Sequence, residues 1–315
     1  MNNINPLVSV IIPTYGRPDL LSRAIDSVLS QSYSDIEIVI VDDNNFDSPE
    51  RKETESVMKK YLEENKIIYV KMTKNSGGAI ARNKGVESST GELICFLDDD
   101  DEFLPNKVQL QVEKYLESKS TLSVIGGYAN ILDTNGNLKR IEKNEINGDV
   151  FKIQLGKNIC TTSIAMINRN TFLEAGGFSN VPSSQEHTLF IKIFSINPLY
   201  DYINAPVVNI YHHDGVRIST GTKKVEGAIL LHEYVSSFYD LLTKEEIVEV
   251  NNSHYVNIIR ANMHTKNNRR NAFRYLWKLI RSKKCIDREI LKVTCIIFLG
   301  FDQIERIKTY IKNEK

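Results

Sequence analysis

Residues 92–105 read ELICFLDDDDEFLP, an apolar run that ends in four consecutive aspartates. The run at 92–97 has the length and composition of a buried strand, and such a strand in an open α/β sheet carries the residues after it to the ligand-binding edge. The four carboxylates crowd so much negative charge that full ionisation is costly unless a cation neutralises it. An all-oxygen set of this kind suits Mg²⁺ or Mn²⁺.

Two interpretations of the acidic run are open at this point. If the chain stays extended, Asp98 and Asp100 point to one side and Asp99 and Asp101 to the other, as at a strand end that binds metal. The alternative is a solvated acidic turn that caps the helix expected to start near Asn106. The rest of the sequence has to decide between them.

Strand and helix patterns alternate on the N-terminal side of this run. The strands are predicted at 7–13, 36–41 and 67–72, and the helices at 19–29, 49–65 and 78–87. The order βαβαβαβ predicts an α/β fold with a doubly wound, mostly parallel sheet that is flanked by helices. The loops at 14–18, 42–45, 73–78 and 98–101 then share one edge of the sheet.

The pattern changes after residue 118. Strands are predicted at 122–128, 163–168 and 202–211, a turn at 133–137, and helices at 170–175 and 186–196. Mostly helical patterns follow from about residue 225. We therefore predict a catalytic domain at 1–224, with a nucleotide-binding half at 1–118 and an acceptor half at 119–224, and a helical region at 225–315.

Composition excludes several classes of protein. The 315 residues are 41% hydrophobic, and 40 Lys and Arg balance 40 Asp and Glu, so nucleic acid is not an expected partner. We see no apolar run of about 18 residues and no signal sequence, which predicts a cytoplasmic protein. The four cysteines form no Cys-x-x-Cys pair, so reduced thiols are expected rather than disulfides or zinc ligands.

Several motifs in order resemble the opening of glycosyltransferase family 2. They are VSVIIPTY at 8–15, SVLSQSY at 27–33, EIVIVDD at 37–43, NSGGAIARNKG at 75–85 and FLDDDD at 96–101. The match covers roughly residues 7–220. It implies a GT-A fold, a nucleotide-diphosphate sugar donor, a divalent metal and inversion at the anomeric carbon.

The resemblance also implies roles for individual residues in donor binding. Pro13, Tyr15 and Asp43 would form the nucleoside pocket, with the Asp43 carboxylate accepting the uracil N–H, which favours UDP. From the residues alone, Asp43 could equally make an Asx turn at the strand end. Arg82 and the amides around Gly77 and Gly78 would face the diphosphate.

The D-x-D motif of the family falls on Asp98-Asp99-Asp100. Asp100 is the expected main ligand of Mn²⁺ or Mg²⁺, and Asp98 or Asp99 would hold the ribose or a metal-bound water. The metal ligands are thus predicted as Asp100 and Asp98. The metal would stabilise charge on the departing UDP, so that one carboxylate base suffices.

The expected base is Glu186, where the family often has an aspartate followed by Leu and Arg. Leu189 and Lys192 occupy those following positions, and the alternative for Glu186 is a helix-start glutamate that offsets the dipole. His212 and His213 follow the last predicted strand, and in relatives a histidine here can approach the metal or diphosphate. A surface position is the alternative for both histidines.

The C-terminal region is basic and aromatic. Residues 266–292 hold ten Lys or Arg against two acidic residues, with aromatic residues among them. This pattern favours peripheral contact with the inner face of the cell membrane through 266–301, near a lipid-linked acceptor, and a helical cap with a solvated basic face is the alternative.

The predicted function is transfer of a sugar from a UDP-sugar to a glycan or polyprenyl-diphosphate-linked acceptor, in O-antigen, capsule or related polysaccharide synthesis. Two alternatives are kept. One is a nucleotidylyltransferase, which also uses acidic metal ligands on an α/β sheet, and the other is an inactive sugar-nucleotide-binding protein.

Overall fold

The computed structural model describes residues 5–63, 66–119, 121–211, 222–264, 268–283, 286–300 and 303. By their internal contacts the residues form two compact units. The first comprises Met1–Gln154, Asn158–Asn180 and Thr188–Asp214, and the second comprises Leu155–Lys157, Val181–His187 and Gly215–Lys315. We describe each unit by itself.

The first unit begins with alternating strands and helices, as predicted. The elements are β1 (Val8–Thr14), α1 (Pro18–Leu29), β2 (Ile36–Asp42), α2 (Pro49–Met58), β3 (Ile67–Lys71), α3 (Gly78–Glu87) and β4 (Leu93–Phe96). β1 pairs in parallel with β2 on one side and with β4 on the other, and β2 pairs in parallel with β3. The doubly wound, mostly parallel sheet is confirmed.

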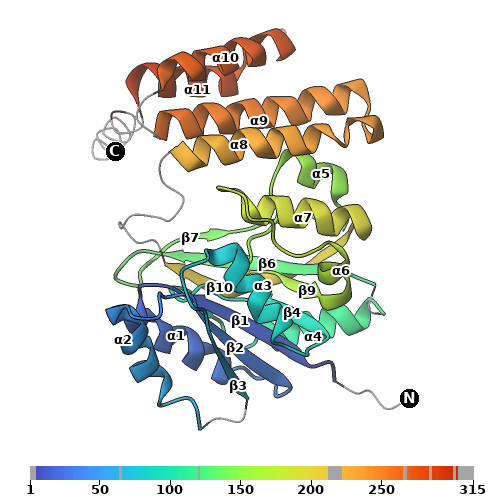
Figure 1. The fold of residues 1–315 in the computed structure, drawn as a ribbon. Helices are drawn as coiled ribbons and strands as arrows, with labels where there is room; N and C mark the ends of the chain where they lie inside the picture. The colour runs from blue at the N-terminus through green and yellow to red at the C-terminus, as the bar shows by residue number, and fades with distance from the viewer. Residues whose placement is uncertain are drawn as a thin grey trace. The chain divides into compact units, whose positions relative to one another are not determined.

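The chain reverses its direction of winding at β1. The first two crossovers move outward to β3, and the third returns to β4, so α1 and α2 cover one face and α3 the other (Figure 1). The strand ends on either side of this switch point open the crevice in which α/β sheets bind ligands. Thr14 ends β1 and Asp42 ends β2 at the same level.

The sheet continues with mixed pairing. Its further elements are β5 (Glu102–Phe103), α4 (Lys107–Glu117), β6 (Val124–Leu132), β7 (Leu138–Glu142), β8 (Gly148–Asp149), α5 (Phe151–Gly156), β9 (Met166–Asn168), α6 (Arg169–Glu174), α7 (Gln185–Ile196) and β10 (Leu199–Tyr211). β9 lies antiparallel between β4 and β6, and β6 runs parallel to β10. The predicted turn at 133–137 joins β6 to β7, where Gly136 has a φ of 81°.

The apolar patterns explain these elements. β1 and β2 are almost wholly buried, as expected for β-branched strands covered on both faces. In α1 the buried residues Leu21, Ala24, Ile25 and Val28 recur at helical spacing, and Pro18 occupies the first turn. α2 ends at Met58, earlier than the predicted 65, because the amide of Tyr61 turns back to Met58 O at 2.9 Å.

The second unit is helical and has its own apolar core. It contains α8 (Thr222–Ser236), the short 3-10 helix η1 (Tyr239–Leu241), α9 (Lys244–His264), α10 (Arg269–Lys283) and α11 (Arg288–Leu299). Its core gathers Ile258 and Ile259 of α9, Leu279 of α10, and Val293 and Ile297 of α11. The predicted C-terminal helical extension is confirmed.

Candidate functional site

The four aspartates after β4 form a turn. The amide of Asp101 donates to Asp98 O at 3.0 Å, so the chain does not stay extended as the two-sided alternation required. Aspartate is a common turn residue, which explains the difference. The turn brings one carboxylate oxygen each of Asp98, Asp100 and Asp101 within 4.8 Å of one another.

Asp101 is the buried member of this group of three. Its carboxylate accepts from Ser163 Oγ at 3.0 Å and from the amide of Tyr211 at 3.3 Å. Burial, and then the charges of Asp98 and Asp100, raise the pKa of Asp101 well above its ordinary value. Three crowded oxygen donors on a fixed turn are a donor set that suits a hard divalent cation.

Asp99 is not a member of this group of three. Its side chain is buried, accepts from Thr14 Oγ1 at 2.7 Å and forms an ion pair with Arg17 Nη2 at 2.5 Å. Burial raises the pKa of Asp99 to about 7 although Arg17 and Thr14 oppose the shift. Asp99 therefore joins the ends of β1 and β4 at the switch point of the sheet.

Three arginines surround the acidic turn. Arg82 in α3 forms an ion pair with Asp98, and Arg17 also forms one with Asp100. Arg23 Nη2 donates to the backbone oxygen of Asp100 at 2.5 Å, and its guanidinium lies 3.7 Å from the centre of the Tyr211 ring. Carboxylates and cations thus face each other at the edge where the sequence predicts an anionic ligand.

Asp43 joins the end of β2 to the start of α3. Its two carboxylate oxygens accept from the amides of Ser76 and Gly77, each at 2.8 Å, and burial raises its pKa. The Asx turn that was the alternative for Asp43 belongs to Asp42, whose Oδ1 accepts from the amide of Asn44 at 3.0 Å. The fixed Asp43 carboxylate holds Gly77, whose φ of 91° suits glycine.

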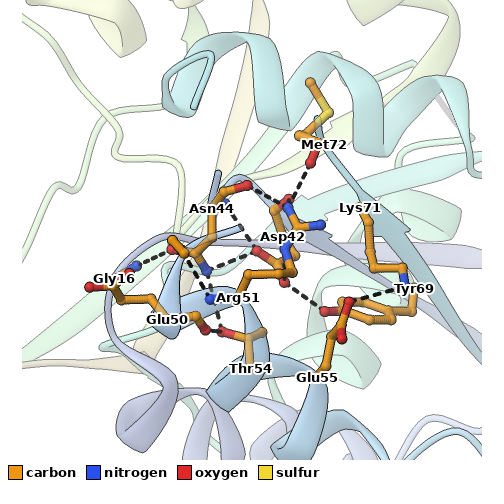
Figure 2. Close-up of polar contacts among 11 residues, drawn as sticks. Gly16, Asp42, Asn44, Glu50, Arg51, Thr54, Glu55, Tyr69, Lys71 and Met72 are labelled. Atoms are coloured by element: carbon orange, nitrogen blue, oxygen red, sulfur yellow. Dashed lines mark hydrogen bonds and ion pairs between the residues drawn. The ribbon is translucent and has the colours of Figure 1, made fainter. Parts of the chain in front are cut away.

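A buried arginine holds the neighbouring loops together, as Figure 2 shows. Arg51 is 3% exposed, and its Nη2 donates to the backbone oxygens of Asp42, Asn44 and Met72 at 3.0, 2.5 and 2.6 Å. Its Nε forms an ion pair with Asp42 Oδ2 at 2.9 Å, and Asn44 Oδ1 accepts from the amide of Gly16. The guanidinium therefore links the ends of β2 and β3, and the Asn44 side chain extends this network to Gly16 after β1.

The remaining predicted donor-binding residues lie at the same edge. Pro13 and Tyr15 are at the end of β1, and the Tyr15 ring is 45% exposed and accessible to a ligand. Gly78 is the first residue of α3 and lies close to Arg82. A Cβ added to Gly78 would be 2.9 Å from Arg82 Nη1. The loops of β1, β2, β4 and α3 thus gather the predicted nucleotide-binding residues.

The residue predicted as the base belongs to the second unit. Glu186 is a half-buried residue in the first turn of α7, within the second unit. Lys192, at the position where the family often has arginine, donates to Gly177 O in the first unit. His212 and His213 lie outside the described residues.

Sequence reasoning placed Asp101 and Arg17 in loops at this edge without assigning either a role, and it missed Arg51 altogether. Asp101 was placed on the side opposite Asp98 and Asp100 because that interpretation assumed an extended chain. Arg17 lies in the loop at 14–18, which the sequence places at the ligand-binding edge of the sheet. Arg51 gave no signal, because in a charged helix a buried arginine looks like any solvated one.

Comparison with known proteins adds to this geometry. The family model of Glycosyl transferase family 2 matches residues 9–175, which includes β1, β2 and the acidic turn. An uncharacterized glycosyltransferase of Rickettsia conorii is 30% identical over 282 residues, covering 85% of this chain and 44% of the relative. This chain therefore spans less than half the length of that relative.

Two further proteins are similar over different extents. TuaG of Bacillus subtilis, named as a teichuronic acid biosynthesis glycosyltransferase, is 37% identical over 127 residues, covering 40% of this chain and 48% of TuaG. The structure of Staphylococcus aureus TarS residues 1–349 with UDP-GlcNAc superposes with a TM-score of 0.58 at 14% identity, covering 88% and 89% of the two chains. This likeness confirms the GT-A-like fold.

The strand order, the acidic turn at the switch point and a family match over more than half of the sequence agree with one another. The chain belongs to glycosyltransferase family 2.

Proposed function

We propose that the protein transfers a sugar from a UDP-sugar to a hydroxyl group, with inversion at the anomeric carbon and with a divalent metal. The observation that carries the proposal is the group of three carboxylates of Asp98, Asp100 and Asp101 within 4.8 Å at the switch point of the sheet. The match to the family model supports the same reaction class.

The chain's own residues would hold the donor at the carboxyl edge of β1, β2 and β4. Tyr15 would stack on the base, and Asp43, fixed by two amides, has lone pairs left to accept the uracil N–H. Arg82 would turn to the diphosphate that lies near Asp98. The TarS complex was solved with UDP-GlcNAc, which supports a UDP-sugar here.

The donor set fits Mn²⁺ or Mg²⁺. Asp100 and Asp98 would be ligands as predicted, and Asp101 would join them, because a cation would offset the burial and the repulsion from Asp98 and Asp100 that raise its pKa. When bound, the metal would stabilise the negative charge that develops on the UDP leaving group. Asp99 would position the turn through Thr14 and Arg17 rather than contact the cation.

Glu186 remains our candidate for the base that takes the proton of the acceptor hydroxyl. Such a base must come within hydrogen-bond reach of that hydroxyl. The acceptor is proposed to be a glycan or a polyprenyl-diphosphate-linked sugar of a surface polysaccharide. TuaG, which is named for teichuronic acid biosynthesis, supports this class of product.

A donor panel measured by UDP release tests the proposal. With Mn²⁺ and one UDP-sugar we expect release of UDP, and Asp100→Asn should lower the rate by about 100-fold or more, because an electrostatic contribution to leaving-group departure is lost. The matched control is Asp35→Asn, which changes an exposed aspartate before β2 at the opposite edge. Full activity of Asp100→Asn, or full activity in the presence of EDTA, would contradict the metal site.

Glu186→Gln tests the base in the same assay. We expect transfer to be lost while UDP affinity stays nearly unchanged, since the amide cannot accept a proton. The exposed Glu174→Gln is the control. Pyrophosphate release from a nucleoside triphosphate would indicate a nucleotidylyltransferase, and UDP binding without any turnover would indicate a binding protein.

A further inference from the structure

Helix α10 exposes a basic and aromatic stripe. Arg270, Phe273, Arg274, Trp277 and Arg281 are exposed and recur at intervals of three and four residues, which places them on one side of the helix. The opposite side, with Ala272, Leu276 and Leu279, is buried in the core of the second unit. The orientation of the stripe is therefore fixed by packing.

Helix α11 exposes a similar stripe. The charged and large apolar residues of this stripe are Arg288, Leu291, Lys292, Phe298 and Leu299; the exposed Cys295 lies among them and is not counted in the stripe. Its buried side includes Val293 and Ile297. Figure 1 shows α10 and α11 next to each other.

The two stripes meet at an aromatic contact. The rings of Phe273 and Phe298 pack edge to face with their centres 5.4 Å apart, although these side chains are 40% and 61% exposed. The ten residues of the two stripes are here called the α10–α11 face. This face is continuous and combines large apolar groups with cations.

The charge of the α10–α11 face is entirely positive. It holds five basic residues, Arg270, Arg274, Arg281, Arg288 and Lys292, and none of its ten residues is acidic. The two acidic residues nearby in sequence, Asp287 and Glu289, each form an ion pair of 2.6 Å with Lys283, which is not part of the face. The positive charge of the face is therefore not offset by these carboxylates.

We propose that the α10–α11 face binds the surface of an anionic phospholipid membrane, with both helices lying in the plane of the interface. Cations would contact lipid phosphates, while Phe298, Leu291 and Trp277 would enter the region between headgroups and acyl chains. Trp277 is 59% exposed, and the guanidinium carbon of Arg281 lies 4.4 Å from its ring centre. Tryptophan is enriched at membrane–water interfaces, and here it is placed beside a cation that can contact lipid phosphate.

Other partners fit the face less well. A second copy would bring five positive charges against five more in a symmetric contact, which is repulsive. Nucleic acid would satisfy the cations but leave Leu291, Phe298 and Leu299 exposed to water, and the net charge of the chain is zero. An anionic bilayer satisfies the charged and the apolar groups together.

The proposed contact is peripheral. α11 has 12 residues and is about 18 Å long, whereas the hydrocarbon core of a bilayer is about 30 Å thick. Among the residues that the structure describes, none of the helices combines the length and hydropathy required to cross a membrane.

The chain contains a single tryptophan, Trp277, so its intrinsic tryptophan fluorescence reports on this face alone. The full-length protein is titrated with vesicles of phosphatidylcholine that contain roughly one third phosphatidylglycerol. We expect a blue shift of the emission and quenching by brominated acyl chains, and neither effect with pure phosphatidylcholine. No shift and no pelleting with the anionic vesicles would overturn the proposal.

Variants separate the two contributions to binding. Neutralising Arg270, Arg274 and Arg281 to glutamine should weaken vesicle binding about 100-fold, because each basic residue near such a surface contributes about a five-fold gain in affinity. The control neutralises the exposed Lys52, Lys59 and Lys60 around α2, which changes the net charge equally. Equal loss in both variants would contradict a specific face.

Phe298→Ser tests the apolar contribution and should weaken binding about ten-fold, by removing apolar area that the bilayer covers. The exposed Leu241→Ser is its control. A concentration-dependent dimer that shields Trp277 without lipid would instead assign the face to a second copy. Vesicle binding needs no donor or metal, so Asp100→Asn should bind vesicles normally even if the proposed reaction proves wrong.

Discussion

At the scale of single residues, Arg51 holds the ends of β2 and β3 together in the first unit. Its side chain is almost fully buried, and it pairs with Asp42, whose own side chain is fully buried. Asp42 Oδ2 also accepts from Tyr69 Oη at 2.6 Å. Burial, and then Asp42, raise the pKa of Tyr69, so the tyrosine stays protonated as the donor.

Arg51→Ala should destabilise the first unit by about 3–5 kcal/mol, because the buried Asp42 carboxylate loses its counter-ion and three backbone oxygens each lose a donor. Arg51→Lys should recover only part of this loss, because one ammonium cannot reproduce the planar set of donors. Urea unfolding followed by circular dichroism measures the difference. The neighbouring exposed Lys52→Ala is the control, and an unfolding midpoint equal to wild type for Arg51→Ala would refute the role of the network.

At the scale of helices, three histidine rings stack between elements of the second unit. His254 of α9 lies between His187 and His232, with ring centres 6.0 and 5.2 Å away. Its Nε2–H donates to Leu155 O at 2.8 Å. Burial, opposed by this hydrogen bond, lowers the pKa of His254 to about 4, and burial also lowers the pKa of His232.

These pKa values predict loss of stability in mild acid. His254 has an ordinary pKa of 6.5, so between pH 6.5 and about 4 the unfolded chain binds a proton that the folded chain does not. The contribution of neutral His254 to stability is therefore fully present above pH 6.5 and is lost as the pH decreases through this window. The free energy of unfolding should be lower by about 2 kcal/mol at pH 5 than at pH 7.5. Unfolding midpoints in urea at the two pH values measure the loss.

His254→Gln should reduce this pH dependence, because the glutamine amide can still donate to Leu155 O and does not titrate. The exposed His264→Gln is the matched control on the same helix. If His254→Gln keeps the full drop between pH 7.5 and pH 5, the buried ring is not its source.

The strongly periodic elements were predictable from sequence. Helix α3 has the predicted bounds, and β1 to β4 agree with the predicted strands within about a residue. β9 starts three residues later than predicted, because residues 161–165 form a turn in which the amide of Ala165 reaches Thr161 O. A short apolar run cannot show where such a turn ends.

The site was predictable where one residue follows a strand and unpredictable where distant residues meet. Asp98 and Asp100 were found from a strand end and Asp43 from the family motif, and all three lie at one edge of the sheet. Asp101 joined them through a turn, and Arg51 reaches from α2 to the residues at the ends of β2 and β3, which are contacts that no local pattern encodes. The roles assigned to Glu186, His212 and His213 stay predictions.

At the scale of the whole molecule, the two units interleave along the sequence. Leu155–Lys157 and Val181–His187 cluster with the C-terminal helices, although the residues around them belong to the first unit. Ser253 Oγ donates to Gly156 O at 2.6 Å, and a Cβ added to Gly227 would clash with Ser183. The predicted domain boundary at residue 224 stays a proposal, and two segments that precede it belong to the second unit.

A chain ended at residue 224 should be less stable and bind more of a hydrophobic dye than the full chain. It keeps Leu155–Lys157 and Val181–His187 but loses α9, whose side chains contact the Leu155 and Gly156 carbonyl groups. A chain ended at residue 300 retains α8 to α11 and is the control. An unfolding midpoint equal to that of the full chain would instead support independent domains that meet at 224.

The Arg51 network has a consequence for engineering by loop exchange. If residues 42–45 alone are replaced by those of a relative, the new carbonyl groups at positions 42 and 44 must still accept hydrogen bonds from Arg51 of the original chain. The turn at 133–137 between β6 and β7 differs, because Asp133 accepts from the amides of Asn135 and Asn137 within the turn, so this turn can be grafted alone. The loops that follow β1, β2 and β3 are therefore transplantable only as a block together with helix α2.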